Sequence, residues 1–381
     1  SDQVFDYVRW EAEALAVKVG ETLWGRHPFM SEVDRSQYVR DYMALLAQTQ
    51  ALEGQIDRLY SDPATIDPTA ASAELRAERD ANRAELRSRQ PLAESILEGQ
   101  VAAVLVDQGF GVAGQLLPPM SMHFTQMPNL LIVSPRDRIS FDIYINLNPM
   151  PVDMRAALEA RVDALPNLSS LIVPLGGTAI YPAMILETAS IEYAVEVIAH
   201  EWLHHYLYAF PLGYSYDFGG ESRIINETTA NLFGRELGPL VLARYYPELV
   251  PQPAPPSTPS APSSAAPSPE PPAFDYGETM NETRVHVDEL LAAGEVDEAE
   301  AYMEERRQLF TDNGYLIRKL NQAYFAFYGG YQSGAPGVGG RDPIGPAVHH
   351  LRETSPSIYE WILTMRDITT RDQLLAAQEA A

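Results

Sequence analysis

The pattern with the clearest chemical meaning is the run His200-Glu201-Trp202-Leu203-His204. It lies within the segment IEYAVEVIAHEWLHHYLYAF, where apolar residues recur at helical spacing, so we predict a long helix. Residues four apart share one face of a helix, and both imidazoles can therefore reach one metal ion. Glu201 can then accept a proton from a water that this metal activates. The spacing is typical of a hydrolytic zinc site.

The surroundings of the motif favour a bound metal. The flanking runs VEVIA and LYAF are apolar, so His200, Glu201 and His204 are expected on a largely buried helix, where unpaired ionisable groups are costly. The alternative is a set of core histidines satisfied by backbone carbonyls. His205 follows the motif directly and points one helical step away from the metal face. We therefore expect His205 to be a surface or packing residue.

A catalytic zinc needs a third protein ligand and an open fourth position. We predict Glu227, which follows His204 by 23 residues and lies in a segment that is helical from about Arg223 onward. Glu221 is the alternative ligand at a shorter spacing. It lies at the expected helix start, where a carboxylate commonly serves as a capping or dipole partner. The expected content is one Zn²⁺ per chain.

The run NETTAN around Glu227 resembles the glutamate helix of the gluzincins, the HExxH zinc peptidases that include thermolysin-like peptidases and the large aminopeptidases. The resemblance covers roughly residues 170–236. It implies that His200 and His204 are ligands, Glu201 the catalytic base and Glu227 the third ligand. It also implies a zincin-like scaffold and a peptide or protein substrate.

Three features separate the chain from particular groups of HExxH zinc peptidases. Asn231 lies one turn after Glu227, where thermolysin-like members have an acidic residue bonded to a ligand histidine, so here an amide would orient the ligands. The Gly-x-Met-Glu-Asn pattern of the large aminopeptidases is absent from the sequence, and so is the Gly-x-x-His of the metzincin signature shortly after His204. Specificity for a free N-terminus is therefore unsupported, and the choice between endopeptidase and exopeptidase stays open.

Zincins bind substrate as an extended strand against the edge strand that precedes the active-site helix. The segment Thr178–Met184 is predicted to be that edge, and Pro182 within it suits an edge better than a central strand. A strand with a bend is the alternative. The tetrahedral intermediate also needs a hydrogen-bond donor. We predict Tyr328 and Tyr331 in this catalytic role, with Tyr324, His349 and His350 as other candidates and core packing as the alternative for the tyrosines.

The order of patterns predicts an α+β fold that is predominantly helical, with a zincin-like core of a small mixed sheet, the HExxH helix and the glutamate helix. Residues 1–108 form a helical region, in which AELRAERDANRAELRSRQ is typical of an exposed helix or antiparallel coiled coil. Residues 109–248 form the metal-binding core. A Pro/Ser/Ala-rich linker covers 249–275, and a helical subdomain covers 276–381.

Composition excludes several functions. The chain has 52 acidic and 27 basic residues, for a net charge of -25, so nucleic acid and anionic membranes are disfavoured as partners. It has no cysteine, so any metal must be held by histidines and carboxylates. No apolar run approaches the ~20 residues that cross a bilayer, and we expect no membrane insertion of this segment. The sequence is compatible with an extracytoplasmic protein, secreted or anchored through a preceding segment, while compartment and oligomeric state stay open.

The leading hypothesis is therefore hydrolysis of peptide bonds by a zinc-activated water. Two other functions remain open at this point. The first keeps the fold as a metal-stabilised scaffold without catalysis, which uses its helical and proline-rich segments for interaction. The second is a helical interaction protein in which the HExxH run occurs by chance and no stoichiometric metal is bound.

Overall fold

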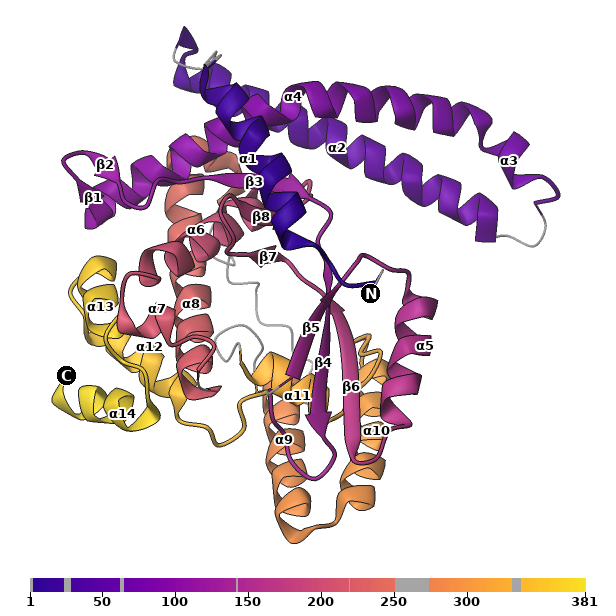
Figure 1. The fold of residues 1–381 in the computed structure, drawn as a ribbon, viewed down its shortest axis with the longest axis vertical. Coiled ribbons are helices and arrows are strands. Elements are labelled where there is room, and N and C mark those ends of the chain that lie inside the picture. The colour runs from indigo at the N-terminus through magenta and orange to yellow at the C-terminus, as the bar shows by residue number, and fades with distance from the viewer. Residues whose placement is uncertain are drawn as a thin grey trace, which may run out of the picture. The chain divides into compact units, whose positions relative to one another are not determined.

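The structure is a computed structural model that describes residues 3–23, 29–61, 65–141, 143–218, 220–250, 274–330 and 337–381. The described residues are mostly helical, with small sheets of two or three strands (Figure 1). The predicted α+β, predominantly helical class is confirmed. The chain forms two compact units, each assembled from separate stretches of sequence. The first unit is Ser1–Pro128, Pro174–Ala209 and Phe233–Pro247, and the second is Asn129–Val173, Phe210–Leu232 and Glu248–Ala381.

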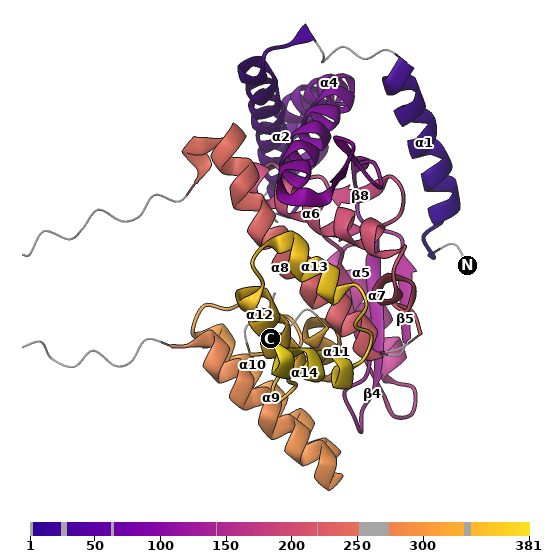
Figure 2. The same cartoon turned by 90° about the vertical axis from the view of Figure 1, so that its left-hand side faces the viewer.

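The N-terminal part of the first unit is a pair of long helices that lie side by side (Figures 1 and 2). Between them, Asp67 caps a short helix by accepting a 2.9 Å hydrogen bond from the N–H of Ala70, and Pro68 occupies its first position. The long helices predicted in this part of the chain are confirmed, and the run AELRAERDANRAELRSRQ lies on α4, which packs against α2. The elements are α1 (Tyr7–Leu23), α2 (Glu32–Ser61), α3 (Pro68–Ala71) and α4 (Ala73–Leu105).

A three-stranded sheet in the same unit comes directly before the motif helix. Its order is β3-β8-β7, with β3 parallel and β7 antiparallel to β8. Helix α6 packs against β7, β8 and α4. The elements of this part are β1 (Gly111–Val112), β2 (Gln115–Leu116), β3 (Met122–Thr125), β7 (Gly177–Thr178), β8 (Ala183–Leu186), α6 (Ile191–Leu207) and α8 (Gly220–Tyr245). Only residues 233–245 of α8 belong to this unit.

The predicted continuous edge strand Thr178–Met184 is wrong. Thr178 ends the two-residue strand β7, and Ala183 begins β8, which is the central strand of the sheet. Residues 179–182 form the bend between them, as in the alternative interpretation of this segment. Pro182 lies outside the strands, so its missing N–H does not interrupt the ladder. The edge of this sheet on that side is β7 alone.

The second unit is built around the sheet β5-β4-β6, in which β4 and β5 are antiparallel. Leu131, Val133 and Ile172 from this sheet form a buried core against which Leu158 and Val162 of α5 pack. Helix α11 lies against β4. The elements are β4 (Asn129–Pro135), β5 (Ile143–Leu147), α5 (Val152–Asp163), β6 (Leu168–Pro174), α7 (Pro211–Tyr214), residues 220–232 of α8, α9 (Tyr276–Ala293), α10 (Val296–Asp312), α11 (Gln322–Gly329), α12 (Ile344–Thr354), α13 (Ile358–Met365) and α14 (Arg371–Ala380).

Most predicted elements are confirmed in type and order. The runs MHFTQMPNLLIVSP and ISFDIYINLN, whose β-branched and aromatic residues predict strands, contain β3, β4 and β5. The run DMRAALEARVDALPN, whose helical spacing predicts a helix, covers α5 from Asp153 onward. The four-segment domain scheme stays a prediction, since each compact unit draws residues from more than one segment. Most of the linker, residues 251–273, lies outside the described residues. In the described ranges, no helix combines the length and apolarity needed to cross a membrane.

Candidate metal site

Helix α6, which carries the motif, is fixed at its start and along one face. The Ser190 side chain accepts a 3.1 Å hydrogen bond from the N–H of Tyr193 and so caps the helix. Trp202 is buried, donates from Nε1 to the carbonyl oxygen of Pro118 at 3.0 Å, and packs edge-on against Phe110 with ring centroids 5.5 Å apart. With 3.6 residues per turn, the positions two before and two after Trp202 lie on the opposite face. That face carries the histidines.

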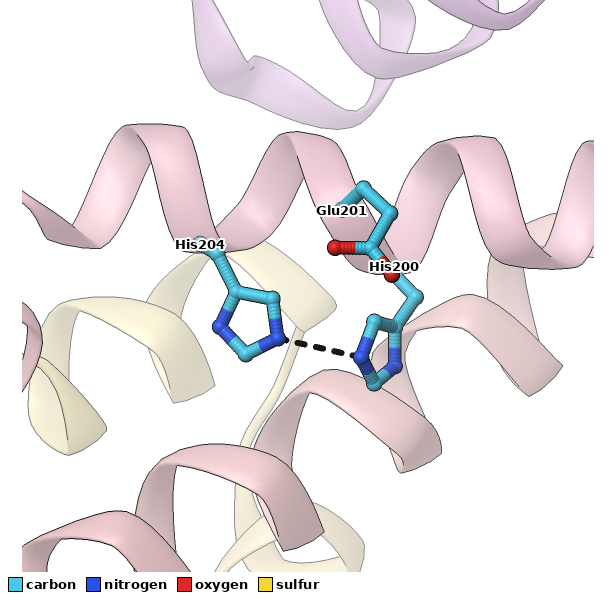
Figure 3. A group of neighbouring side chains, drawn as sticks. All are labelled: His200, Glu201 and His204. Atoms are coloured by element: carbon cyan, nitrogen blue, oxygen red, sulfur yellow. Dashed lines mark hydrogen bonds between the residues drawn. The ribbon is translucent and has the colours of Figure 1, made fainter. Parts of the chain in front are cut away.

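The two histidines converge on one point. The Nε2 atoms of His200 and His204 lie 3.0 Å apart, and Figure 3 shows the two rings turned toward each other with Glu201 beside them. One ligand atom from each of the three residues lies within 4.8 Å of the others. Two nitrogens bound to one tetrahedral zinc at ~2.0–2.1 Å are about 3.3 Å apart. The observed separation therefore fits a shared metal after a small adjustment of the rings.

The cluster is largely removed from water. Glu201 is 5% exposed and His204 is 8% exposed, while His200 is half-buried. The sequence prediction that these three groups share a buried helix is confirmed. Burying such groups close together is costly unless each is compensated, and a divalent cation compensates all three at once.

Glycine on β7 makes room for the carboxylate of Glu201. A Cβ atom at Gly177 would lie 2.1 Å from Glu201 Oε1 and 2.9 Å from Val197 Cγ1. A larger residue at position 177 would therefore require the Glu201 carboxylate or the β7 backbone to shift from this arrangement. Gly177 was not identified from the sequence. The signal that could have found it is the Gly176-Gly177 pair at the start of the short strand β7.

Two glycines let α8 approach α6 in the first unit. A Cβ at Gly234 would lie 2.6 Å from the carbonyl oxygen of Glu196 and 3.3 Å from the Cβ of His200, and Gly238 faces the backbone N and Cα of Glu196. Both glycines therefore lie against the turn of α6 around Glu196, where the two helices come close. This contact was not identified from the sequence, although two glycines four residues apart on one predicted helix were its signal.

His205 is a packing residue, as predicted. Its Nε2 donates to the carbonyl oxygen of Ile180 at 2.9 Å, and its ring lies edge-on to Tyr181 with centroids 5.4 Å apart. Burial lowers the pKa of His205 to about 4, so the imidazole is neutral at neutral pH. It supports the bend before β8 rather than joining the metal cluster.

Glu227 belongs to the second unit, in residues 220–232 of α8. It is 5% exposed, and its Oε1 accepts a hydrogen bond from the hydroxyl of Tyr216. The alternative ligand Glu221 lies in the first turn of α8, where it accepts a 3.1 Å hydrogen bond from the N–H of Arg371. This contact is with the first residue of α14, so the expected capping or dipole role of Glu221 at the start of α8 stays a prediction. Tyr216 was not identified from the sequence, because an isolated tyrosine in a loop carries no pattern.

The predicted oxyanion donors are only partly described. Tyr328 lies on α11 with its ring 4.5 Å from that of Tyr324 and 5.0 Å from that of Phe327, and burial raises its pKa. These contacts agree with the packing alternative, and its catalytic role stays a prediction. Tyr331 lies outside the described residues. Asn231, half-buried on α8 in the second unit, keeps its predicted orienting role as a prediction.

Comparisons with known proteins identify no relative of this chain. No family model, no curated protein and no solved structure matches the chain. The gluzincin resemblance thus rests on the residues themselves, and the functional argument rests on the geometry of α6 and its neighbours.

Proposed function

We propose that this protein is a zinc-dependent peptidase in which His200, His204 and Glu227 hold one zinc ion and Glu201 is the general base. The observation that carries the proposal is the 3.0 Å separation of the two histidine Nε2 atoms, with the Glu201 carboxylate in the same cluster. Helical spacing alone brings positions 200 and 204 together, so the further support is burial: Glu201 and His204 are 5% and 8% exposed, and a bound cation would compensate the cost of burying them.

The choice of Glu227 as third ligand is supported by its spacing and its sequence context. It follows His204 by 23 residues and lies in the run NETTAN, which resembles the glutamate helix of the gluzincins. Glu227 is also buried and hydrogen-bonded to Tyr216, as ligating carboxylates commonly are. Glu221, engaged with Arg371, is the weaker candidate.

The proposed chemistry divides between the metal and Glu201. When bound, zinc lowers the pKa of water from 15.7 toward about 7 and polarises a carbonyl. Glu201 accepts the proton of the attacking water as its oxygen adds to the carbonyl carbon of the peptide bond. As the C–N bond breaks, Glu201 passes that proton to the departing nitrogen, so a new carboxyl group and a new amine are formed.

The position of β7 supports an extended peptide as substrate. This strand is the edge of its sheet, and its Gly177 touches Glu201. A peptide that pairs with the outer side of β7 would run past the proposed base. The net charge of -25 would favour approach of basic peptides, an effect that salt screens. In this proposal the sheet β3-β8-β7, α6 and α8 correspond to the zincin-like core.

The decisive experiment measures metal content and hydrolysis together. We expect about one zinc per chain by mass spectrometry of protein purified without chelators, and cleavage of a peptide mixture. Glu201→Gln should retain zinc and lose cleavage, whereas His204→Ala should lose zinc. Stoichiometric zinc without cleavage would favour an inactive scaffold. Absence of metal after zinc is offered would overturn the proposal in favour of an interaction protein with a misleading motif.

A further inference from the structure

We infer that Tyr216 is a positioning residue that holds Glu227 in the conformation in which it binds metal. This inference rests on the proposed function, because it gives a role to a neighbour of the proposed ligand. The hydroxyl of Tyr216 donates a hydrogen bond to Glu227 Oε1. Both residues belong to the second unit, with Tyr216 in the loop that follows α7 and Glu227 on α8.

The ring of Tyr216 is held by a buried guanidinium. Arg223 Cζ lies 5.0 Å from the centroid of the Tyr216 ring, 5.0 Å from that of Phe141 and 4.7 Å from that of Tyr144. The Arg223 side chain is only 9% exposed, and a cation is attracted to an aromatic face more strongly when it is desolvated. Arg223 thus sits in an aromatic box made by Phe141, Tyr144 and Tyr216.

Hydrogen bonds connect the aromatic box to Asp217, which lies in the loop that bears Tyr216, and Arg223 connects it to α8. Arg223 Nη2 donates to Asp217 Oδ1 at 3.1 Å, and the Tyr144 hydroxyl donates to the same oxygen at 2.9 Å. Arg223 lies four residues before Glu227, so both project from the same face of α8. The guanidinium therefore fixes the tyrosine on the side of the helix from which Glu227 projects.

A tyrosine is suited to this task. Its neutral hydroxyl donates to a carboxylate without neutralising it, and hydrogen bonds to charged acceptors are the stronger ones. A carboxylate has two oxygens, so one can accept from Tyr216 while the other binds a metal. Carboxylate ligands are commonly oriented in this way, and loss of such a partner costs 10–100-fold in metal affinity.

The test is the zinc dissociation constant of Tyr216→Phe, measured by competition with a fluorescent chelator. We expect zinc to bind 10–100-fold more weakly than to the wild type. Tyr276→Phe is the matched control, since it removes a hydroxyl that contacts Tyr324 in the same unit without touching the aromatic box. We expect this control to bind zinc as the wild type does. Circular dichroism of the zinc-free proteins checks that both variants fold.

A double-mutant cycle separates positioning from a general structural role. If Tyr216 acts through Glu227, Tyr216→Phe should weaken zinc binding in the wild type but have little further effect in Glu227→Ala. An equal loss in both backgrounds, or wild-type affinity in Tyr216→Phe, would overturn the role of Tyr216 while leaving the zinc site intact. A wild-type protein that binds no zinc, or Glu227→Ala with unchanged affinity, would instead contradict the proposed ligand set.

Discussion

Gly177 lies so close to Glu201 that a Cβ atom on this residue would be 2.1 Å from the Oε1 of the carboxylate. The contact joins the two-residue edge strand β7 to the motif helix α6. Real Cβ atoms do not approach an oxygen this closely, so any other residue would force the strand or the carboxylate to move. The conformation of the proposed base therefore depends on a glycine 24 positions earlier in the sequence.

Replacement of Gly177 by alanine should separate catalysis from metal binding. We expect Gly177→Ala to lower kcat/KM for peptide cleavage by about 100-fold, because a displacement of ~1 Å costs roughly that much when it affects an aligned catalytic group. Zinc content should stay that of the wild type, since the added methyl group meets Glu201 and Val197 rather than either histidine. Peptide cleavage and metal analysis of the same preparation check both parts.

A control for this variant is available on α4. A Cβ at Gly99 would meet nothing within 4 Å, so Gly99→Ala changes the same atoms without a clash. Its activity should equal that of the wild type. Full activity in Gly177→Ala would show that the carboxylate can retreat without loss, and that the close approach has no catalytic role.

The two glycines of α8 provide a matched pair on one helix. Gly234→Ala places a methyl group 2.6 Å from the backbone oxygen of Glu196, whereas at Gly238 the nearest atom is 3.6 Å away. We expect Gly234→Ala to lower the free energy of unfolding by about 1–3 kcal/mol through overpacking. Gly238→Ala should be neutral or stabilising by up to about 1 kcal/mol, since alanine favours helix. Urea unfolding of both variants measures the difference, and equal stabilities would contradict the close crossing of α6 and α8.

Local patterns predicted the elements that carry the site. The helical spacing of apolar residues located α6, and the spacing of four placed His200 and His204 on one of its faces. Alternating and β-branched runs located β4 and β5. These features could be predicted because each depends on neighbours within a few residues.

Contacts between distant residues could not be predicted in this way. Strand β7 has two residues, too few for any periodicity. The predicted edge strand is wrong because its residues belong to two separate strands, β7 and β8, with a bend between them. Gly177 is defined by its contact with Glu201, and Tyr216 by its hydrogen bond to Glu227. A single sequence records such pairs only as isolated residues, so their roles appear once the chain is folded.

Zinc binding should stabilise the folded protein. A ligand that binds only the native state adds about 2.7 kcal/mol when its free concentration is 100 times its Kd. We expect added zinc to raise the Tm of the wild type and a chelator to reverse the shift. His204→Ala should show no zinc-dependent shift, because it removes one of the two converging nitrogens.

The control for that measurement is His286→Ala, which removes a histidine with a 48% exposed side chain on α9. Its Tm should respond to zinc as the wild type does. A zinc-dependent shift of the same size in His204→Ala would place the bound metal elsewhere in the chain.

A buried ionic cluster away from the motif should make stability depend on pH. On α4, Glu98 accepts a 2.7 Å hydrogen bond from the N–H of Met122 and lies 3.0 Å from Lys18 Nζ, while the neighbouring Glu94 contacts both Lys18 and His123. Burial raises the pKa of Glu98 from 4.5 to about 7, and the attraction of Lys18 opposes this rise. Between pH 4.5 and about pH 7, Glu98 is protonated to a greater extent in the folded protein than in the unfolded chain. The stability that the protonated carboxyl provides is therefore present below about pH 4.5 and is lost as the pH rises through about 7.

Glu98→Gln should remove this dependence, because an amide cannot ionise and its oxygen can still accept from Met122. At about 1.4 kcal/mol per pKa unit, we expect the free energy of unfolding of the variant relative to the wild type to rise by roughly 3 kcal/mol between pH 4.5 and pH 8. Urea unfolding at both pH values measures this change. Glu85→Gln removes the same charge from a side chain on α4 that is 47% exposed, and should show a change below about 1 kcal/mol. If the two variants respond to pH alike, burial of Glu98 is not the origin of the effect.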